Sequence, residues 1–165
     1  MRHVIGIDPG QKGAWCCLEV RSGDIEEWSP LPIVAKELDG ALLSDVLTGY
    51  WPEEKPMVAI EKIHGVPKWG ASNFAFGANF GIIKGVCMAL KLSRFMIPPK
   101  EWQKEMLKGK PRGEKTKASA LQTAREIWPS EPWLATTRCS KPHDGAVDAA
   151  LIAEYCRRKY CGLLS

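Results

Sequence analysis

Hydrophobic and polar positions along the chain follow two periods, one typical of strands and one typical of helices. Short apolar runs bounded by turn residues predict strands, here over residues 2–7, 14–20, 24–28, 57–60 and 95–97. Apolar residues spaced three and four apart predict helices, here over residues 35–47, 76–90, 100–107, 114–127 and 142–159. This order is typical of an α/β fold, in which helices flank both faces of a mixed five-stranded sheet.

The segments between these elements contain residues that favour turns and loops. Residues 8–10 join the first two strands tightly, because proline fixes φ and glycine permits a reversal of the chain. Residues 63–74 are rich in glycine, proline and polar residues and are expected to form a loop. Within the second predicted helix, Gly77, Gly81 and Gly85 recur every four residues and line one stripe. Because glycine is costly inside a helix, the stripe predicts close approach of another backbone.

The length and composition fit one domain, which we take to span residues 1–165. With 165 residues, of which 45% are hydrophobic and 25% charged, the chain resembles an ordinary globular domain. It has no run of about 18 apolar residues, so we expect no membrane span, and no secretory signal is visible at its start. Without such a signal, the six cysteines are expected to be reduced thiols. The alternative is a zinc site of nonstandard ligand spacing, drawn from Cys139, His143, Cys156 and Cys161.

Basic residues are concentrated in the middle of the chain. The net charge is +4 overall, but residues 84–125 carry 11 basic and 3 acidic side chains. Most of these basic residues lie around Trp102, namely Lys100, Lys104, Lys108, Lys110, Arg112, Lys115 and Lys117. A basic stretch beside an aromatic side chain is typical of a surface that binds a nucleic-acid backbone. A solvated helix face is the alternative.

Four acidic residues occupy positions that suggest a shared site. Asp8 ends the first predicted strand and Glu61 ends the fourth, each directly after an apolar run. Asp144 and Asp148 lie four apart and therefore share one face of the last predicted helix. Taken singly, an acid can simply form a turn or favour a helix N-terminus. Four converging carboxylates require a cation, and their oxygens suit Mg²⁺, two ions of which can clamp a phosphodiester.

At these residues the sequence resembles the RuvC-type Holliday junction resolvases, in the variant found in phages, bacteria and plastids. The matching motifs are GIDPG at 6–10, VAIE at 58–61, FGANFG at 76–81, PPKEW at 98–102, KTK at 115–117 and HDGAVDA at 143–149. The first motif also occurs in sugar kinases and other RNase H-like proteins, whereas the ordered set is specific. A kinase of that kind needs two such domains, and this chain has the length of one.

The resemblance implies an RNase H-like fold, a homodimer, and cleavage of four-way DNA junctions by paired symmetric nicks. It implies two Mg²⁺ ions per active site, with Mn²⁺ able to substitute, and no small-molecule cofactor. The residues that match the family's catalytic and metal-binding acids are Asp8, Glu61, Asp144 and Asp148. In some members the helical acids are three apart, a position that Gly145 occupies here, so either Asp144 or the neighbouring His143 completes the acidic site.

The resemblance also implies DNA-binding residues. A basic pair leads toward the site and further basic residues hold the DNA arms through phosphates, namely Lys115 and Lys117 with Lys100, Lys104 and Arg112. Side chains shortly after Glu61 probe the junction centre, where an aromatic can stack on an unpaired base. The candidates are Trp69, Asn73, Phe74 and Phe76. The alternative is that Phe74 and Phe76 pack in the core or in the dimer contact. The glycine stripe matches the segment that packs the dimer.

Two other functions share part of this pattern. An RNase H-like nuclease acting on other branched DNA or on RNA–DNA hybrids would use the same acids. A non-catalytic protein that binds branched DNA would keep the basic segment but would not need four acids. The resemblance favours the cytoplasm of a bacterial or phage-infected cell as location, with an organellar matrix or stroma after removal of a transit peptide as the alternative.

Overall fold

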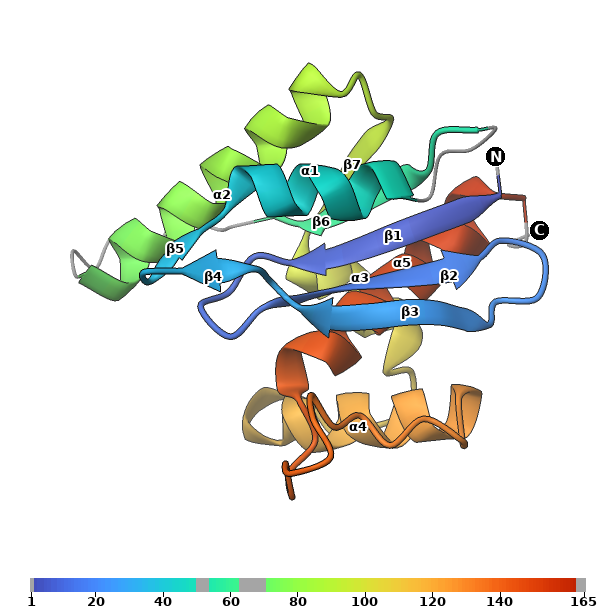
Figure 1. Cartoon of the computed structure of the whole chain (residues 1–165). Coiled ribbons are helices and arrows are strands. Elements are labelled where there is room, and N and C mark those ends of the chain that lie inside the picture. Colours follow the sequence, from blue (N-terminus) through green and yellow to red (C-terminus); the bar gives the residue numbers. More distant parts are fainter. Residues whose placement is uncertain (1, 50–53, 63–70, 163–165) are drawn as a thin grey trace.

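The computed structural model describes residues 2–49, 54–62 and 71–162, with the backbone alone described at 71–73. Five strands form one sheet in the order β3-β2-β1-β6-β7 (Figure 1). They are β1 (His3–Asp8), β2 (Ala14–Glu19), β3 (Ile25–Pro30), β6 (Met57–Glu61) and β7 (Arg94–Ile97). β2 pairs antiparallel with β1 and β3, whereas β6 pairs parallel with β1 and β7. The expected mixed five-stranded sheet is confirmed.

Helices cover both faces of this sheet (Figure 1). One face carries α3 (Pro99–Met106), α4 (Thr116–Ile127), which follows the 3-10 turn η1 (Gly113–Lys115), and α5 (Asp144–Tyr160). The other face carries α1 (Gly40–Gly49) and α2 (Ala71–Ala89). Because side chains alternate along a strand, each central strand contributes to two cores. Val4 and Ala59 pack in the core beneath α5, whereas Ile5 and Ile60 pack in the core shared with α1 and α2.

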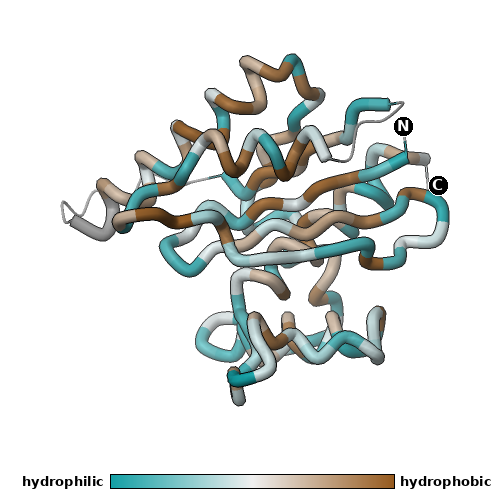
Figure 2. Tube along the Cα trace, in the orientation of Figure 1, coloured by the Kyte–Doolittle hydropathy of each residue, from teal (hydrophilic) through white to brown (hydrophobic). Residues whose placement is uncertain are grey.

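The edge strand β3 differs from the central strands in its polarity. Its sequence, IEEWSP, is largely hydrophilic, and the tube of β3 is coloured accordingly (Figure 2). β1 and β2, in contrast, are buried along almost their whole length. A strand with one exposed side tolerates charged residues, and charges on an edge discourage pairing with other chains.

The backbone of α5 lies directly against β1. A methyl group on Gly6 would lie 2.0 Å from the carbonyl oxygen of Ala149 and 2.6 Å from the nitrogen of Ala153. Glycine in the strand and alanines in the helix therefore allow two backbones to touch. This contact fixes the position of α5 along β1, which matters for the acids that both elements carry.

The predicted helix over residues 35–47 is wrong in its first turn. α1 begins at Gly40, after Asp39, whose Oδ1 accepts hydrogen bonds of 2.9 and 3.0 Å from backbone N–H groups of the first turn. Such a side chain defines a helix start. The residues before it form a small hairpin of β4 (Ile33–Val34) and β5 (Glu37–Leu38).

Two further boundaries differ from the prediction. The predicted loop over 63–74 is wrong at its end, since α2 already begins at Ala71, and residues 63–70 lie outside the described part of the chain. Burial of Ile83 and other apolar residues against the sheet stabilises α2. The helix therefore extends through polar residues in its first turn. The last helix begins at Asp144 because the Nδ1 of His143 caps it.

The six cysteines are all free, as expected. With the side chains as placed in the described ranges, no three His, Cys, Asp or Glu residues are close enough together to hold a metal ion. The residues of the alternative zinc site therefore form no such group. None of the helices in these ranges is long and apolar enough to cross a membrane.

Candidate active site

Two parallel strands bring the first two predicted acids to one edge of the sheet. Asp8 is the last residue of β1 and Glu61 is the last residue of β6. The strands pair with Ile7 beside Ile60, so the next residue of each strand lies at the same level. Both carboxylates therefore emerge where the central strands end.

The first turns of α5 bring the other two acids to this edge. Asp144 begins the helix and Asp148 follows one turn later. A methyl group on Gly145 would lie 2.3 Å from the carbonyl oxygen of Lys12 and 3.1 Å from the Oδ2 of Asp8. The missing side chain at Gly145 thus lets the start of α5 pack against the connection between β1 and β2, beside Asp8.

Burial and mutual repulsion act on three of these carboxyl groups. Burial, followed by the charges of Asp8, Glu61 and Asp144, raises the pKa of Asp148 to about 8. Burial raises the pKa of Glu61 to about 7, with a further increase from Asp8 and an opposing hydrogen bond from Trp102. These shifts follow from like charges in a partly desolvated cluster. Acids that lie up to 140 positions apart in the sequence are therefore close enough in the structure for their charges to change each other's pKa.

The pKa of Asp8 is also raised, mainly by burial. Its Oδ1 accepts a hydrogen bond of 2.9 Å from the backbone N–H of Gly10, which lowers the pKa and fixes the carboxylate in the turn after β1. The charge of Lys117 also lowers it. Asp8 is thus oriented by its own turn and is exposed to the fields of residues from α4 and α5.

The donor set fits a divalent cation of the Mg²⁺ type. Carboxylate oxygens are the ligands that this ion prefers, and a cation would favour the ionised form that burial opposes in Asp8, Glu61 and Asp148. In the present arrangement, no three acids among the described residues are close enough together to coordinate one ion. Binding would therefore require these side chains to turn toward a common point.

A lysine stands beside the outermost acid. The Nζ of Lys117, in the first turn of α4, lies 2.7 Å from the Oδ2 of Asp144. This hydrogen bond raises the pKa of Lys117, and the charges of Asp148 and Asp8 raise it further. Lys117, Asp144 and Asp148 line one small hollow together with Leu121 and Val147. The structure therefore joins one predicted DNA-binding residue to the acidic cluster.

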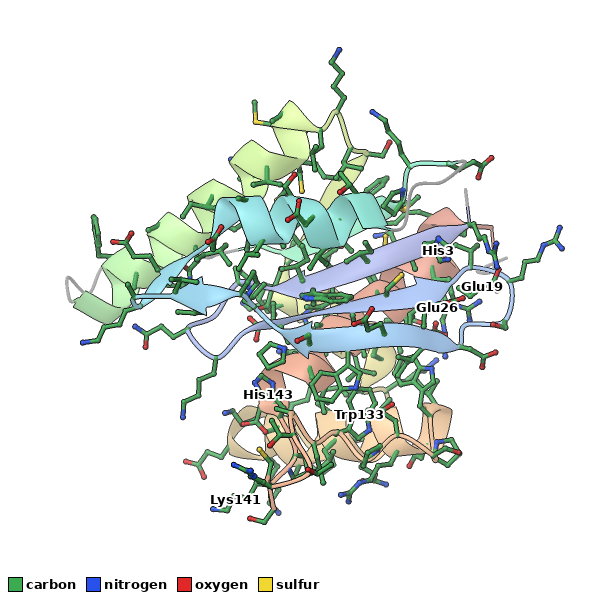
Figure 3. The ribbon with its side chains drawn as sticks, viewed as in Figure 1. His3, Glu19, Glu26, Trp133, Lys141 and His143 are labelled. Atoms are coloured by element: carbon green, nitrogen blue, oxygen red, sulfur yellow. The ribbon has the colours of Figure 1, made fainter. Side chains whose placement is uncertain are left out.

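Two residues near the acids have roles that the sequence did not reveal. Trp102 is fully buried, and its Nε1 donates a hydrogen bond of 2.9 Å to the Oε1 of Glu61. The PPKEW motif and the basic stretch around Trp102 pointed to this residue, but not to a contact with Glu61. His143 accepts a hydrogen bond of 3.1 Å from the N–H of Ala146 through its Nδ1, and it lies with Trp133 on the α4 side of the sheet (Figure 3). Its backbone N–H donates to the carbonyl of Trp133.

The other predicted DNA-binding residues lie on the surface at different places. Exposed basic side chains occur on α3 and around η1, namely Lys100, Lys104, Arg112 and Lys115. Phe74 is 81% exposed near the start of α2, whereas Phe76 is partly buried. Trp69 and the side chain of Asn73 lie outside the described part of the structure. Lys117, described above, differs from these residues because it donates a hydrogen bond to one of the acids, Asp144.

Comparison with solved structures identifies the fold. The chain resembles Thermus thermophilus RuvC in complex with a Holliday junction substrate, with a TM-score of 0.64, coverage of 96% of both chains and 15% sequence identity. A second Thermus thermophilus RuvC structure has a TM-score of 0.64 at 19% identity and covers 94% of this chain and 95% of that chain. The expected RNase H-like fold is confirmed, and its architecture is that of RuvC. No protein-family model matches the sequence, and no curated protein matches it significantly.

Proposed function

We propose that this protein is a structure-selective endodeoxyribonuclease that resolves four-way DNA junctions by paired, metal-dependent hydrolysis of phosphodiester bonds. The observation that carries the proposal is the convergence of Asp8, Glu61 and Asp148 at one sheet edge. It is supported by the likeness of the fold to a RuvC solved with a Holliday junction substrate. Residues 1–165 would act as one nuclease domain.

Two divalent ions would bind at each site, either Mg²⁺ or Mn²⁺ as its substitute. Their ligands would be Asp8, Glu61, Asp144 and Asp148. Such ions activate a water molecule and stabilise the departing 3′-oxygen. Asp8 acts on the pKa of both Glu61 and Asp148, which supports a position between the strand acid and the helix acid. Lys117 borders this cluster with most of its side chain exposed, so its ammonium group can pair with a phosphate there.

The DNA arms would be bound through their phosphates by the exposed basic residues of α3, η1 and the segment between them. This set comprises Lys100, Lys104, Arg112 and Lys115. Contacts of this kind give affinity that falls steeply with salt concentration. The exposed ring of Phe74 would stack on an unpaired base at the junction centre, and Asn73 would lie beside it in the sequence.

A homodimer would match the two cuts that resolution requires, because two equivalent strands call for two sites related by symmetry. α2 offers a surface for this contact. A methyl group on Gly77, Gly81 or Gly85 would meet none of the described atoms within 4 Å, so within one chain the predicted close approach of another backbone is not formed. Met88, on the same helix, is 57% exposed. These open apolar positions support packing against a second copy.

The decisive experiment compares three substrates with labelled strands: a four-way junction, a linear duplex of the same sequence and an RNA–DNA hybrid. With Mg²⁺ we expect symmetric nicks in the junction alone, with 5′-phosphate ends, and no cleavage in EDTA. Preferential cleavage of the hybrid would favour the RNase H-like alternative. Junction binding without cleavage, in Mg²⁺ and in Mn²⁺, would leave only the non-catalytic binding function.

A further inference from the structure

We propose that Trp102 is a positioning residue for Glu61, an inference that rests on the proposed nuclease function. The indole Nε1 of Trp102 donates a hydrogen bond of 2.9 Å to the Oε1 of Glu61. In this proposal the indole holds one carboxylate oxygen in place and leaves Oε2 as the atom that binds a divalent cation. Trp102 itself touches neither the cation nor the DNA.

The fold holds Trp102 rigidly over the end of β6. β7 pairs with β6 so that Ile97 lies beside Glu61, and Pro98 and Pro99 then turn the chain directly into α3. Trp102 occupies the buried face of this short helix and is 0% exposed in the core beneath α5. A connection of one residue, Pro98, and a packed ring leave the indole little freedom to move away from Glu61.

An indole is suited to this role because its N–H only donates hydrogen bonds and does not ionise in the ordinary pH range. It can therefore orient a carboxylate without competing for the cation. An imidazole or a second carboxylate in its place could bind the cation itself. Groups that hydrogen-bond to metal ligands fix their orientation, and their loss commonly reduces metal affinity or activity about 10- to 100-fold. The bond to Glu61 has the geometry of such a contact.

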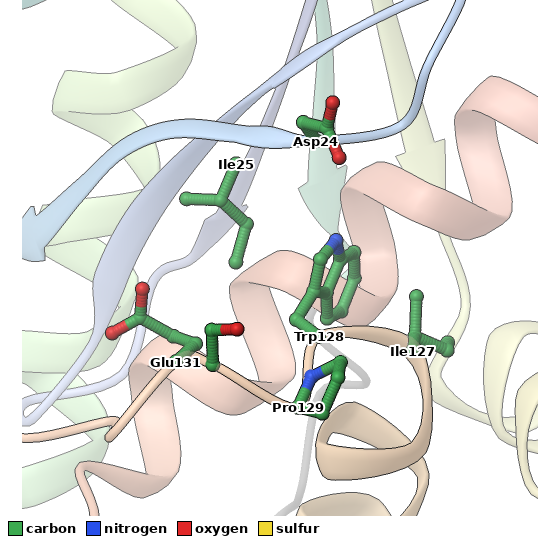
Figure 4. A pocket seen from close by; sticks show the side chains of 7 residues that line it. Asp24, Ile25, Ile127, Trp128, Pro129 and Glu131 are labelled. Carbon is green, nitrogen blue, oxygen red and sulfur yellow. The ribbon is translucent and has the colours of Figure 1, made fainter.

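Trp128 provides a matched control within the same chain. It is 8% exposed, and its Nε1 donates a hydrogen bond of 2.8 Å to the carbonyl oxygen of Gly23. Trp128 lines a pocket between the start of β3 and the end of α4 (Figure 4), with Asp24, Ile25, Ile127, Pro129, Ser130 and Glu131. None of the acids of the candidate active site lines this pocket. Replacing either tryptophan removes a buried indole and a hydrogen-bonded N–H. Of the two, only Trp102 donates its hydrogen bond to an acid of the candidate active site.

The test measures Mg²⁺ binding without DNA in the full chain and in the variants Trp102→Phe, Trp128→Phe and Asp148→Asn. Mg²⁺ is titrated by calorimetry, and the indole ¹H–¹⁵N resonances are followed in the same titration. The resonance of Trp102 is assigned by its loss in Trp102→Phe. We expect it to shift on Mg²⁺ addition while that of Trp128 stays in place. We expect Mg²⁺ affinity to fall about 10- to 100-fold in Trp102→Phe and to stay within twofold of the parent in Trp128→Phe.

The outcomes distinguish a failure of this proposal from a failure of the nuclease function. If the parent binds Mg²⁺ and Asp148→Asn does not, but Trp102→Phe binds as the parent does, the role of Trp102 is refuted while the metal site stands. If the parent neither binds Mg²⁺ nor cleaves a junction, both proposals fail. If Trp102→Phe does not fold, incorporation of β-(3-benzothienyl)alanine at this position, which keeps the ring shape without the N–H, decides by the same affinity measurement.

Discussion

Lys117 Nζ and Asp144 Oδ2 lie 2.7 Å apart, so a lysine that borders the acidic cluster is paired with one of its acids. Both side chains are more than half exposed, at 75% and 56%. An exposed pair of this kind contributes little to folding stability, about 0–1 kcal/mol. Its importance is positional, because a cation bound by Asp144 and an ammonium group beside it compete for the same oxygen.

Lys117→Met should therefore separate metal binding from catalysis. Without the competing ammonium group, Mg²⁺ affinity in the absence of DNA should stay equal or rise a few-fold. Junction cleavage at saturating Mg²⁺ should fall about 10²-fold, because a charge that meets the scissile phosphate is lost. Calorimetry and single-turnover cleavage measure the two effects.

Lys115→Met, which changes the exposed neighbour in η1, is the control. It should alter salt-dependent DNA binding and leave Mg²⁺ affinity as it was. A parallel loss of Mg²⁺ affinity in Lys117→Met would contradict this competition.

The raised pKa of Asp148 predicts how the stability of the metal-free protein depends on pH. Burial and the neighbouring acids raise this pKa from 3.8 to about 8. Between these values the folded state binds more protons than the unfolded state, so the free energy of unfolding falls as pH rises. Each such group contributes at most about 1.4 kcal/mol per pH unit. Thermal melts in EDTA should accordingly show a lower Tm at pH 8 than at pH 6, and Mg²⁺ should restore part of the loss at pH 8.

Asp148→Asn tests the same relationship by removing the charge. The amide does not ionise, so the variant should melt at a higher temperature than the parent at pH 8 in EDTA and show a flatter pH profile. Cleavage should fall by about 10²-fold or more, while junction binding is retained. An exposed acid outside the cluster, changed as Asp45→Asn, should leave both the profile and the cleavage as in the parent. Equal pH profiles for Asp148→Asn and the parent would argue against a buried, repulsive cluster.

The sequence predicts the sheet and the meeting of the acids because both depend on local patterns. Apolar runs mark the strands, and acids directly after two of them emerge at one edge whenever those strands are parallel neighbours, as Asp8 and Glu61 do. The placement of Asp148 follows from the spacing within its helix. The hydrogen bond between Trp102 and Glu61 joins positions 41 apart in the sequence. The pattern of apolar residues does not predict which buried ring contacts which acid.

The hairpin of β4 and β5 was missed for a different reason. Its turn residues, Ala35 and Lys36, have φ values of 50° and 70°, a conformation that is usually signalled by glycine, asparagine or aspartate. Their apolar and basic side chains fit a helical pattern instead. The start of α2 was missed because serine and asparagine at 72 and 73 are typical of loops, whereas packing further along the helix decides its extent.

Gly6→Ala should disturb the candidate active site through the fold. The added methyl group would lie 2.0 Å from the carbonyl oxygen of Ala149, in a contact between two backbones that cannot yield as a flexible side chain does. We expect the free energy of unfolding to fall by about 1–3 kcal/mol or more, and cleavage to fall even where the variant is folded, because α5 carries Asp148. Gly49→Ala, where a methyl group would meet no described atom within 4 Å, is the control and should change stability by less than about 1 kcal/mol. Urea unfolding and junction cleavage measure both.

Gly81→Lys should separate the two copies of the proposed dimer without unfolding either. A methyl group on Gly81 meets no described atom within 4 Å in one chain, so a lysine there is accommodated in the monomer. Its charge would be buried without a partner in a dimer packed through α2, which is strongly unfavourable. Light scattering should then give the mass of a monomer where the parent gives that of a dimer, with unchanged circular dichroism. On a junction, the variant should leave single nicks in place of paired ones. Leu42→Lys, at an exposed apolar position on α1, should remain dimeric, and a dimeric Gly81→Lys protein would place the contact on another face.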